Sequence, residues 1–128
     1  MADTVALAHY FTGDLPAAAD RVFREAEEGR ARILVPEVVI GEFVYIALKG
    51  RLKVSDPTSI ISELLEEVGV SGYMSQTPMD LAAWTDFLGS RVPELHDRMI
   101  AAIASSRSAL GVITNDRELR SLGIPTVW

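Results

Sequence analysis

The hydrophobic positions along the chain alternate between short β-branched runs and longer segments with helical spacing. The short runs predict strands at residues 32–35, 70–75, 111–114 and 125–128. Residues 38–48 and 117–122, which follow two of these runs, have the spacing of helices. Strands that alternate with helices are typical of a parallel sheet covered by helices, so we expect an α/β fold.

Further segments carry apolar residues three and four positions apart, which is the spacing of one helix face. These stripes predict helices around residues 15–26, 60–68, 81–88 and 99–104. Glycines end three of them, at Gly29, Gly69 and Gly89, and prolines precede two, at Pro57 and Pro93. Glycine after a helix and proline at its start are common boundary signals.

Length and composition indicate one folded domain over residues 1–128. Hydrophobic residues make up 48% of the chain and charged residues 23%, which is an ordinary globular mixture. No apolar run approaches the roughly 18 to 20 residues of a membrane span, and no secretory signal is recognisable. The chain has no cysteine and two histidines, which excludes disulfides, thiol catalysis and Cys/His zinc sites. We therefore expect a cytoplasmic protein with no membrane partner.

The net charge is -6, which by itself disfavours a polyanionic partner, but the charge is unevenly distributed. Residues 91–128 carry five arginines against four acids. If some of these acids hold a metal ion, this part of the chain becomes locally basic. Arg91, Arg98 and Arg117 are therefore candidate phosphate contacts, and the alternative is that they are solvated helix charges or ion-pair partners.

Two carboxylates lie on apolar helix faces. The helical neighbours of Glu42 include Val38 and Ile46, so its charge needs a cation or hydrogen-bond donors, or it must be protonated. Asp97 shares a face with Ile100 and other core positions. The alternatives are a partly exposed or ion-paired Glu42, and an Asp97 that stabilises the start of its helix.

Two more carboxylates, Asp3 and Asp116, are expected where a strand ends and a helix begins. Each could be a helix N-cap. The carboxyl ends of parallel strands meet in one crevice, however, and Glu42 and Asp97 lie in helices that could flank it. Two carboxylates about 4 Å apart repel by on the order of 4 kcal/mol, so such a cluster favours a divalent cation. Oxygen ligands indicate Mg²⁺ or Mn²⁺.

The residues around these four acids carry a resemblance to a known family. The sequence resembles the PIN-domain ribonucleases, most closely the VapC-type toxins of toxin–antitoxin pairs. The likeness lies in Asp3-Thr4 before a helix and in the segments 35–42, 95–102 and 112–116. It implies a PIN-like three-layer fold, with a central, mostly parallel sheet of about four to five short strands flanked by helices.

The resemblance also implies a function. It predicts a metal-dependent ribonuclease that hydrolyses RNA phosphodiesters, with a protein antitoxin as partner and a homodimeric state. Bound Mg²⁺ or Mn²⁺ would acidify water and neutralise charge on the phosphate. The site residues it implies are the metal ligands Asp3, Glu42, Asp97 and Asp116, supported by the hydrogen-bonding groups Thr4, Thr114 and Asn115.

The family usually has Ser or Asn after the Asp-Thr pair, whereas this chain has Val5. Only Met1 and Ala2 precede Asp3, so a stunted first strand is expected and a truncated start is a hypothesis. Glu94 is interpreted as an acid that stabilises a helix start, with the edge of the metal pocket as its alternative. His96 is interpreted as a surface or packing residue.

The stripe over residues 60–68 is either core or, as the resemblance suggests, a dimer or antitoxin surface. The aromatic residues are predicted to pack in the core rather than to stack on bases; they are Tyr10, Phe11, Trp84 and Trp128.

Other function classes fit less well. A receiver domain would place a lysine at a late strand end, where neither Lys49 nor Lys53 is expected, and a phosphatase with an Asp nucleophile would have a second Asp where Val5 stands. A non-catalytic PIN-like module that binds RNA or protein remains the alternative to the ribonuclease.

Overall fold

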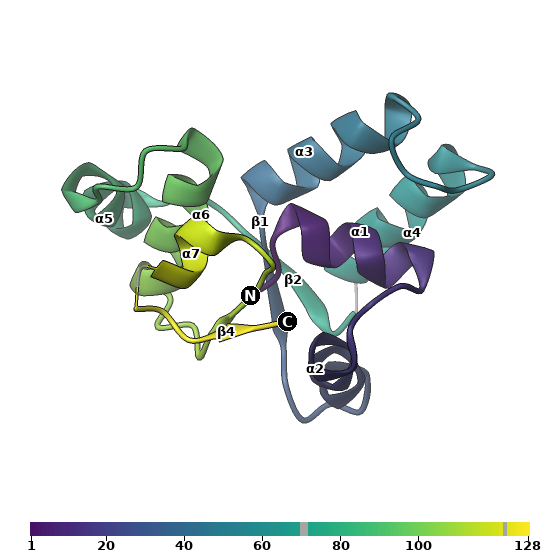
Figure 1. Ribbon diagram of the computed structural model, residues 1–128, viewed down its shortest axis with the longest axis horizontal. Helices are drawn as coiled ribbons and strands as arrows, with labels where there is room; N and C mark the ends of the chain where they lie inside the picture. Colours follow the sequence, from purple (N-terminus) through teal and green to yellow (C-terminus); the bar gives the residue numbers. More distant parts are fainter. Residues whose placement is uncertain (70–71, 122) are drawn as a thin grey trace.

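The computed structural model describes residues 1–69, 72–121 and 123–128, in which helices and short strands alternate (Figure 1). The elements are α1 (Thr4–Thr12), α2 (Ala17–Glu27), β1 (Ile33–Pro36), α3 (Glu37–Leu48), α4 (Pro57–Gly69), β2 (Met74–Thr77), α5 (Leu81–Gly89), α6 (Leu95–Ser106), β3 (Val112–Ile113), α7 (Arg117–Ser121) and β4 (Thr126–Val127).

The strands form two parallel pairs. In the first pair Ile33 of β1 lies opposite Met74 of β2, and in the second Val112 of β3 lies opposite Thr126 of β4. Both pairs are connected through helices, as parallel strands require. This confirms the α/β class that the alternating pattern predicts.

The first three residues join the two strand pairs. The Ala2 amide donates to the Leu34 carbonyl at 3.0 Å on one side. On the other side the Ile113 amide donates to the Met1 carbonyl at 2.7 Å, and Ala2 forms a parallel bridge with Ile113. The order across the fold is therefore β2, β1, residues 1–3, β3 and β4. The stunted strand that the sequence predicts before Asp3 is reduced to the single bridge residue Ala2.

Helices cover these strands on two sides. Figure 1 shows α5, α6 and α7 on one side of the strands and α1, α2 and α4 on the other, which is the expected three-layer arrangement. The core between them includes the fully buried side chains Leu7, Phe23, Phe43 and Ile103. Burial of such side chains contributes about 1.5 to 3 kcal/mol each. None of the helices in the described ranges is long and apolar enough to span a membrane.

One predicted strand lies further along the chain than expected. The strand expected at residues 70–75 is found at Met74–Thr77, because its register is set by pairing with β1 rather than by its own apolar run. The beginning of that prediction, Val70 and Ser71, lies outside the described residues, as does Leu122 at the end of the predicted helix 117–122.

The structure favours the core interpretation of one apolar helix face and corrects the interpretation of another. In α4, Leu64 is buried and Ile60 packs against the core, so only Leu65, at 50% exposed, is available to a partner. In α5 the predicted core stripe is largely at the surface, with Leu81 and Leu88 83% and 78% exposed. The core contact of α5 is instead the small, buried Ala83.

Among the aromatic residues predicted to be core, Trp84 is the exception. Its side chain is 45% exposed and meets Phe87 edge to face. Tyr10, Phe11 and Trp128 pack against the core as predicted.

Candidate active site

Asp3 and Asp116 begin helices at the carboxyl ends of neighbouring chain segments. Oδ1 of Asp3 accepts a 2.6 Å hydrogen bond from the Ala6 amide at the start of α1. Oδ1 of Asp116 accepts hydrogen bonds from the amides of Glu118 and Leu119 in α7, at 2.6 and 3.3 Å. Both acids therefore are the N-caps that the sequence allowed. The caps also fix their positions, because the Asp3 amide bonds to the Ile113 carbonyl three residues before Asp116.

Glu42 reaches the same region from α3. This helix begins directly after β1, with Pro36 at its N-cap position. Oε2 of Glu42 accepts a hydrogen bond from the Thr4 hydroxyl at 2.5 Å, and Oε1 lies 3.3 Å from Nδ1 of His96. The carboxylate of Glu42 therefore contacts polar side chains of α1 and α6, and none of its described partners is an arginine.

Asp97 enters from the first turn of α6. It is partly buried, and the following turn carries the buried Ile100. Both residues line one pocket with a volume of about 330 Å³. The pocket brings all four predicted acids together; its walls are Asp3, Thr4, Val5, Glu42, Ile46, Glu94, His96, Asp97, Ile100 and Asp116.

The electrostatics of this pocket are those of crowded negative charges. Burial, together with the charges of Asp116, Glu118 and other neighbouring acids, raises the pKa of Asp97 from 3.8 to about 6. Burial also raises the pKa of Asp3, against the opposing effect of a hydrogen bond from Thr114. Ionised carboxylates that repel one another in a half-buried pocket attract a cation.

The donor set is suited to a hard divalent cation, since it consists of carboxylate oxygens with a hydroxyl nearby. In the part of the chain that the structure describes, no group of three or more His, Asp or Glu side chains is already arranged to hold a metal ion. The oxygens face helix amides and hydroxyl groups instead, as the capping bonds and the Thr4 contact show.

The expected supporting residues separate into two kinds. Thr4 contacts Glu42, and Thr114 is fully buried and accepts a 2.9 Å hydrogen bond from the Asp116 amide. Asn115 is exposed, and its Oδ1 accepts from Arg120 at 3.2 Å. Thr4 and Thr114 therefore fix the acids, whereas Asn115 binds an arginine beside the site.

The three predicted arginines do not line the acid pocket. Arg98 donates to the carbonyls of Phe87 and Ser90 at 2.9 and 2.5 Å, and its guanidinium lies 4.6 Å from the centre of the Phe87 ring. This side chain fastens the loop between α5 and α6. Arg91 and Arg117 are exposed on the chain segments next to the pocket.

His96 and Glu94 agree with their sequence interpretations and also belong to the pocket, since the His96 side chain is 49% exposed and Glu94 is the N-cap residue of α6. Both residues border the pocket, and His96 contacts Glu42 on another helix. Adjacent helical residues do not share a face, which is why His96 was separated from Asp97. The site, however, lies at the N-terminal end of α6, where side chains from successive residues can reach one cavity. Glu118 does not line the pocket, but its charge is among those that raise the pKa of Asp97.

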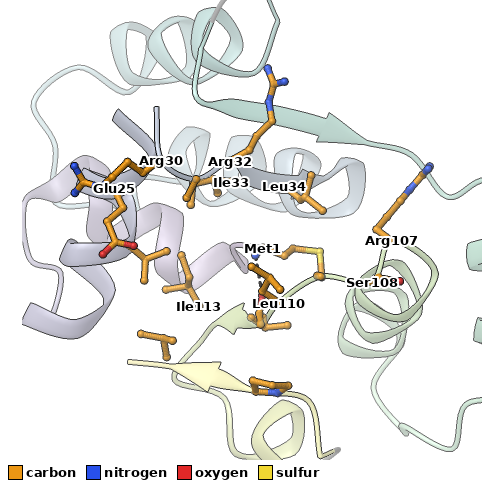
Figure 2. A pocket seen from close by; sticks show the side chains of 17 residues that line it. Met1, Glu25, Arg30, Arg32, Ile33, Leu34, Arg107, Ser108, Leu110 and Ile113 are labelled. Atoms are coloured by element: carbon orange, nitrogen blue, oxygen red, sulfur yellow. Dashed lines mark hydrogen bonds between the residues drawn. The ribbon is translucent and has the colours of Figure 1, made fainter. Parts of the chain in front are cut away.

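A second hollow, of about 470 Å³, lies at the other end of the strands and holds none of the four acids. Figure 2 shows Met1, Leu34 and Ile113 at its centre, while the side chains of Arg32 and Arg107 extend away from Met1. The Met1 ammonium group donates to the Gly111 carbonyl at 2.8 Å, and burial lowers its pKa to about 6.

Comparisons with known proteins agree with this fold. The family model of the PIN domain matches residues 1–125. A crystal structure of VapBC2 from Rickettsia felis, bound to a DNA fragment from its promoter, contains a similar fold with a TM-score of 0.75. That similarity covers 100% of this chain and 98% of the other chain at 14% sequence identity. No curated protein matches the sequence.

Proposed function

The chain belongs to the PIN domain family, and we propose that it is a metal-dependent endoribonuclease that acts as the toxin of a toxin–antitoxin pair. The observation that carries this proposal is the pocket in which Asp3, Glu42, Asp97 and Asp116 meet. These acids come from four separate segments of the chain. Capping accounts for the positions of Asp3 and Asp116, but it does not account for Glu42 and Asp97, which reach the same cavity from α3 and α6.

The four carboxylates would hold Mg²⁺ or Mn²⁺. The ion would supply positive charge to the scissile phosphate and lower the pKa of a water molecule. The chain contributes by holding the ligands in place before substrate arrives. Helix amides hold Asp3 and Asp116, and the Thr4 hydroxyl holds Glu42. These bonds set the positions of the side chains, whereas the final arrangement of their oxygens would form when the ion binds, since no three of the described acids already surround one point.

Hydrolysis of the phosphodiester then needs no covalent intermediate with the protein. Water would attack phosphorus in line with the departing ribose oxygen, so that one P–O bond forms as the other breaks. The apolar side chains of Val5 and Ile100 narrow the pocket around the acids. Val5 is 44% exposed and offers the substrate no hydrogen bond where the family usually has Ser or Asn.

We also propose an antitoxin partner and a homodimer, in the cytoplasm. The similar solved structure contains VapBC2, which supports a partner of this kind. The exposed stripe of Leu81, Trp84 and Leu88 on α5 supports a contact between two copies of the chain. These residues are three and four positions apart, so they form one face, and an isologous contact would pair that face with itself.

The test is cleavage of single-stranded RNA in Mn²⁺, Mg²⁺ or EDTA by the wild-type chain and by Asp97→Asn. We expect cleavage with either ion, none in EDTA, and a loss of at least about a hundredfold in the variant, as for removal of a major electrostatic contribution. Asp86→Asn is the matched control, because Asp86 lies on α5 and does not line the acid pocket. RNA binding without cleavage would instead favour the non-catalytic module.

A further inference from the structure

Another cavity, distinct from the hollow around Met1, lies next to the acid pocket along α3. This neighbouring hollow has a volume of about 470 Å³, and its walls are Val38, Gly41, Glu42, Tyr45, Ile46, Arg51 and His96. Glu42, Ile46 and His96 line both cavities. The two cavities are therefore neighbours, and a molecule long enough to pass the side chains that they share could occupy both.

This hollow contains an exposed aromatic ring. Tyr45 is 55% exposed, although it lies in the middle of an apolar helix. The ammonium group of Lys49, one helical turn later, lies 5.7 Å from the centre of the Tyr45 ring. A cation against a ring holds the ring in one orientation, and it also adds positive charge beside it. Exposed aromatic rings next to cations are the usual platforms for the bases of single-stranded nucleic acids.

The turn after α3 places a second cation in the same hollow. Gly50 has a φ of +66°, which glycine adopts without strain. This conformation lets the amides of Gly50 and Arg51 bond back to the carbonyls of Ala47 and Ile46, at 3.0 Å each. The chain thus reverses at Gly50 and returns Arg51 to the wall of the hollow, beside Tyr45.

The charges in this hollow differ from those in the acid pocket. In the described part of the chain, neither Lys49 nor Arg51 forms an ion pair with an acid. Their charges are therefore available to phosphate groups. Glu42, the one acid in the hollow, belongs to the acid pocket as well and would be neutralised there by the bound ion.

We propose that Tyr45, Arg51 and Lys49 form a nucleotide subsite next to the cleavage pocket. One base of a single-stranded RNA stacks on the Tyr45 ring, and a phosphate beside it is bound by Arg51 and Lys49. The His96 side chain lies between this subsite and the scissile phosphate. The proposal rests on the proposed ribonuclease function, since it assigns a binding role to the surface that leads to its catalytic acids.

The experiment measures RNA binding without cleavage. A fluorescein-labelled RNA of mixed sequence, about 12 nucleotides long as suits a single-strand site, is titrated with the Asp97→Asn protein in Mg²⁺. We expect Tyr45→Leu to weaken binding about tenfold, because the leucine keeps apolar area and loses the stacking surface. Tyr45→Phe, which keeps the ring, should bind as the parent does.

The charge is tested through salt dependence. Arg51→Gln should lower the slope of log K against log salt by about 0.7, the value for one phosphate contact on a single strand. Arg51→Lys should keep that slope, and Arg21→Gln on the exposed surface of α2 serves as a distant control. Tyr45, Arg51 and Arg21 are exposed side chains, so equal melting temperatures of the variants and their parent check that folding is unchanged.

The outcomes separate the subsite from the nuclease. Binding that depends on Tyr45 and Arg51, together with no cleavage by the wild type, supports the subsite and overturns the ribonuclease. Cleavage with an unchanged KM in Tyr45→Leu overturns the subsite and leaves the ribonuclease intact. Unchanged RNA affinity, with self-association lost in Tyr45→Leu, shows that this face is a protein contact and also overturns the subsite.

Discussion

The Thr4 hydroxyl donates a 2.5 Å hydrogen bond to Oε2 of Glu42 and so ties the first turn of α1 to the middle of α3. Thr4 follows Asp3 directly, and Asp3 is held by both a helix amide and the β3 carbonyl of Ile113. One short segment therefore positions two of the four acids. The two remaining acids begin or nearly begin their own helices, at α6 and α7.

The first prediction concerns this contact. Thr4→Val keeps the shape of the side chain and removes the donor, so Glu42 loses its 2.5 Å partner. Because Glu42 is one-third exposed, we expect a loss of about 1 kcal/mol in unfolding free energy, less than for a fully buried charged bond. Urea denaturation measures this, and RNA cleavage should fall with it. Thr4→Ser is the control; equal behaviour of the Val variant and wild type would contradict the role assigned to the hydroxyl.

The second prediction is a pH dependence of stability. Burial and neighbouring acids raise the pKa of Asp97 in the folded protein from 3.8 to about 6. The folded chain thus binds this proton more tightly than the unfolded chain, and the stability that Asp97 contributes is lost as pH rises from 3.8 to about 6.

Asp97→Asn should therefore be more stable than wild type at neutral pH in EDTA. We expect a difference of about 1 kcal/mol, after allowance for solvent screening of this partly exposed side chain. The difference should disappear below the ordinary pKa of aspartate, where both side chains are neutral. Thermal unfolding across pH measures it, and a variant less stable than wild type at neutral pH would refute the crowding of charge.

The third prediction adds the metal ion. Mn²⁺ at 100 times its dissociation constant should stabilise the wild-type chain by about 2.7 kcal/mol, which raises the melting temperature by several degrees. Asp97→Asn should gain much less, so the order of stability of the two proteins reverses between EDTA and Mn²⁺. An equal gain in both proteins would place the ion elsewhere.

The fourth prediction distinguishes Arg98 from the other arginines. Arg98→Gln should lower the unfolding free energy by about 2 kcal/mol, because two loop carbonyls lose charge-assisted bonds and Phe87 loses its cation contact. Arg91→Gln, at an exposed loop position, should leave stability unchanged. If Arg98→Gln instead keeps its stability and lowers the salt dependence of RNA binding, Arg98 is a phosphate contact after all.

The fifth prediction addresses the homodimer. Leu88→Glu places a charge in the exposed apolar face of α5 and should convert a dimer into a monomer, as measured by light scattering. Leu65→Glu on α4 is matched in chemistry and tests the other helix. Dissociation by the Leu65 change alone would return the interface to α4.

The sequence could predict most of the elements because their signals are local. Gly69 and Gly89 end α4 and α5 at the expected positions. The β-branched runs predict three of the four strands, β1, β3 and β4, to within one or two residues. The local signals did not predict which side of a helix is buried in the core. Leu81 and Leu88 have the spacing of core residues, yet both side chains are exposed to solvent. The residue of α5 that is buried in the core is Ala83.

The four candidate acids could be recognised from the sequence on two grounds. Each is a carboxylate on an apolar helix face or at a helix start, and each lies in a segment that resembles the PIN-domain family. Spacing along the chain determined that Glu42 and Asp97 lie on apolar helix faces and that Asp3 and Asp116 begin helices. Only the tertiary structure decided that they share one pocket, and that His96 and Glu94 border it. It also decided that Arg98 serves the fold while Arg51 turns back to Tyr45. The reason is physical: periodicity fixes which way a side chain leaves its own helix, whereas its partner is fixed by how distant segments pack.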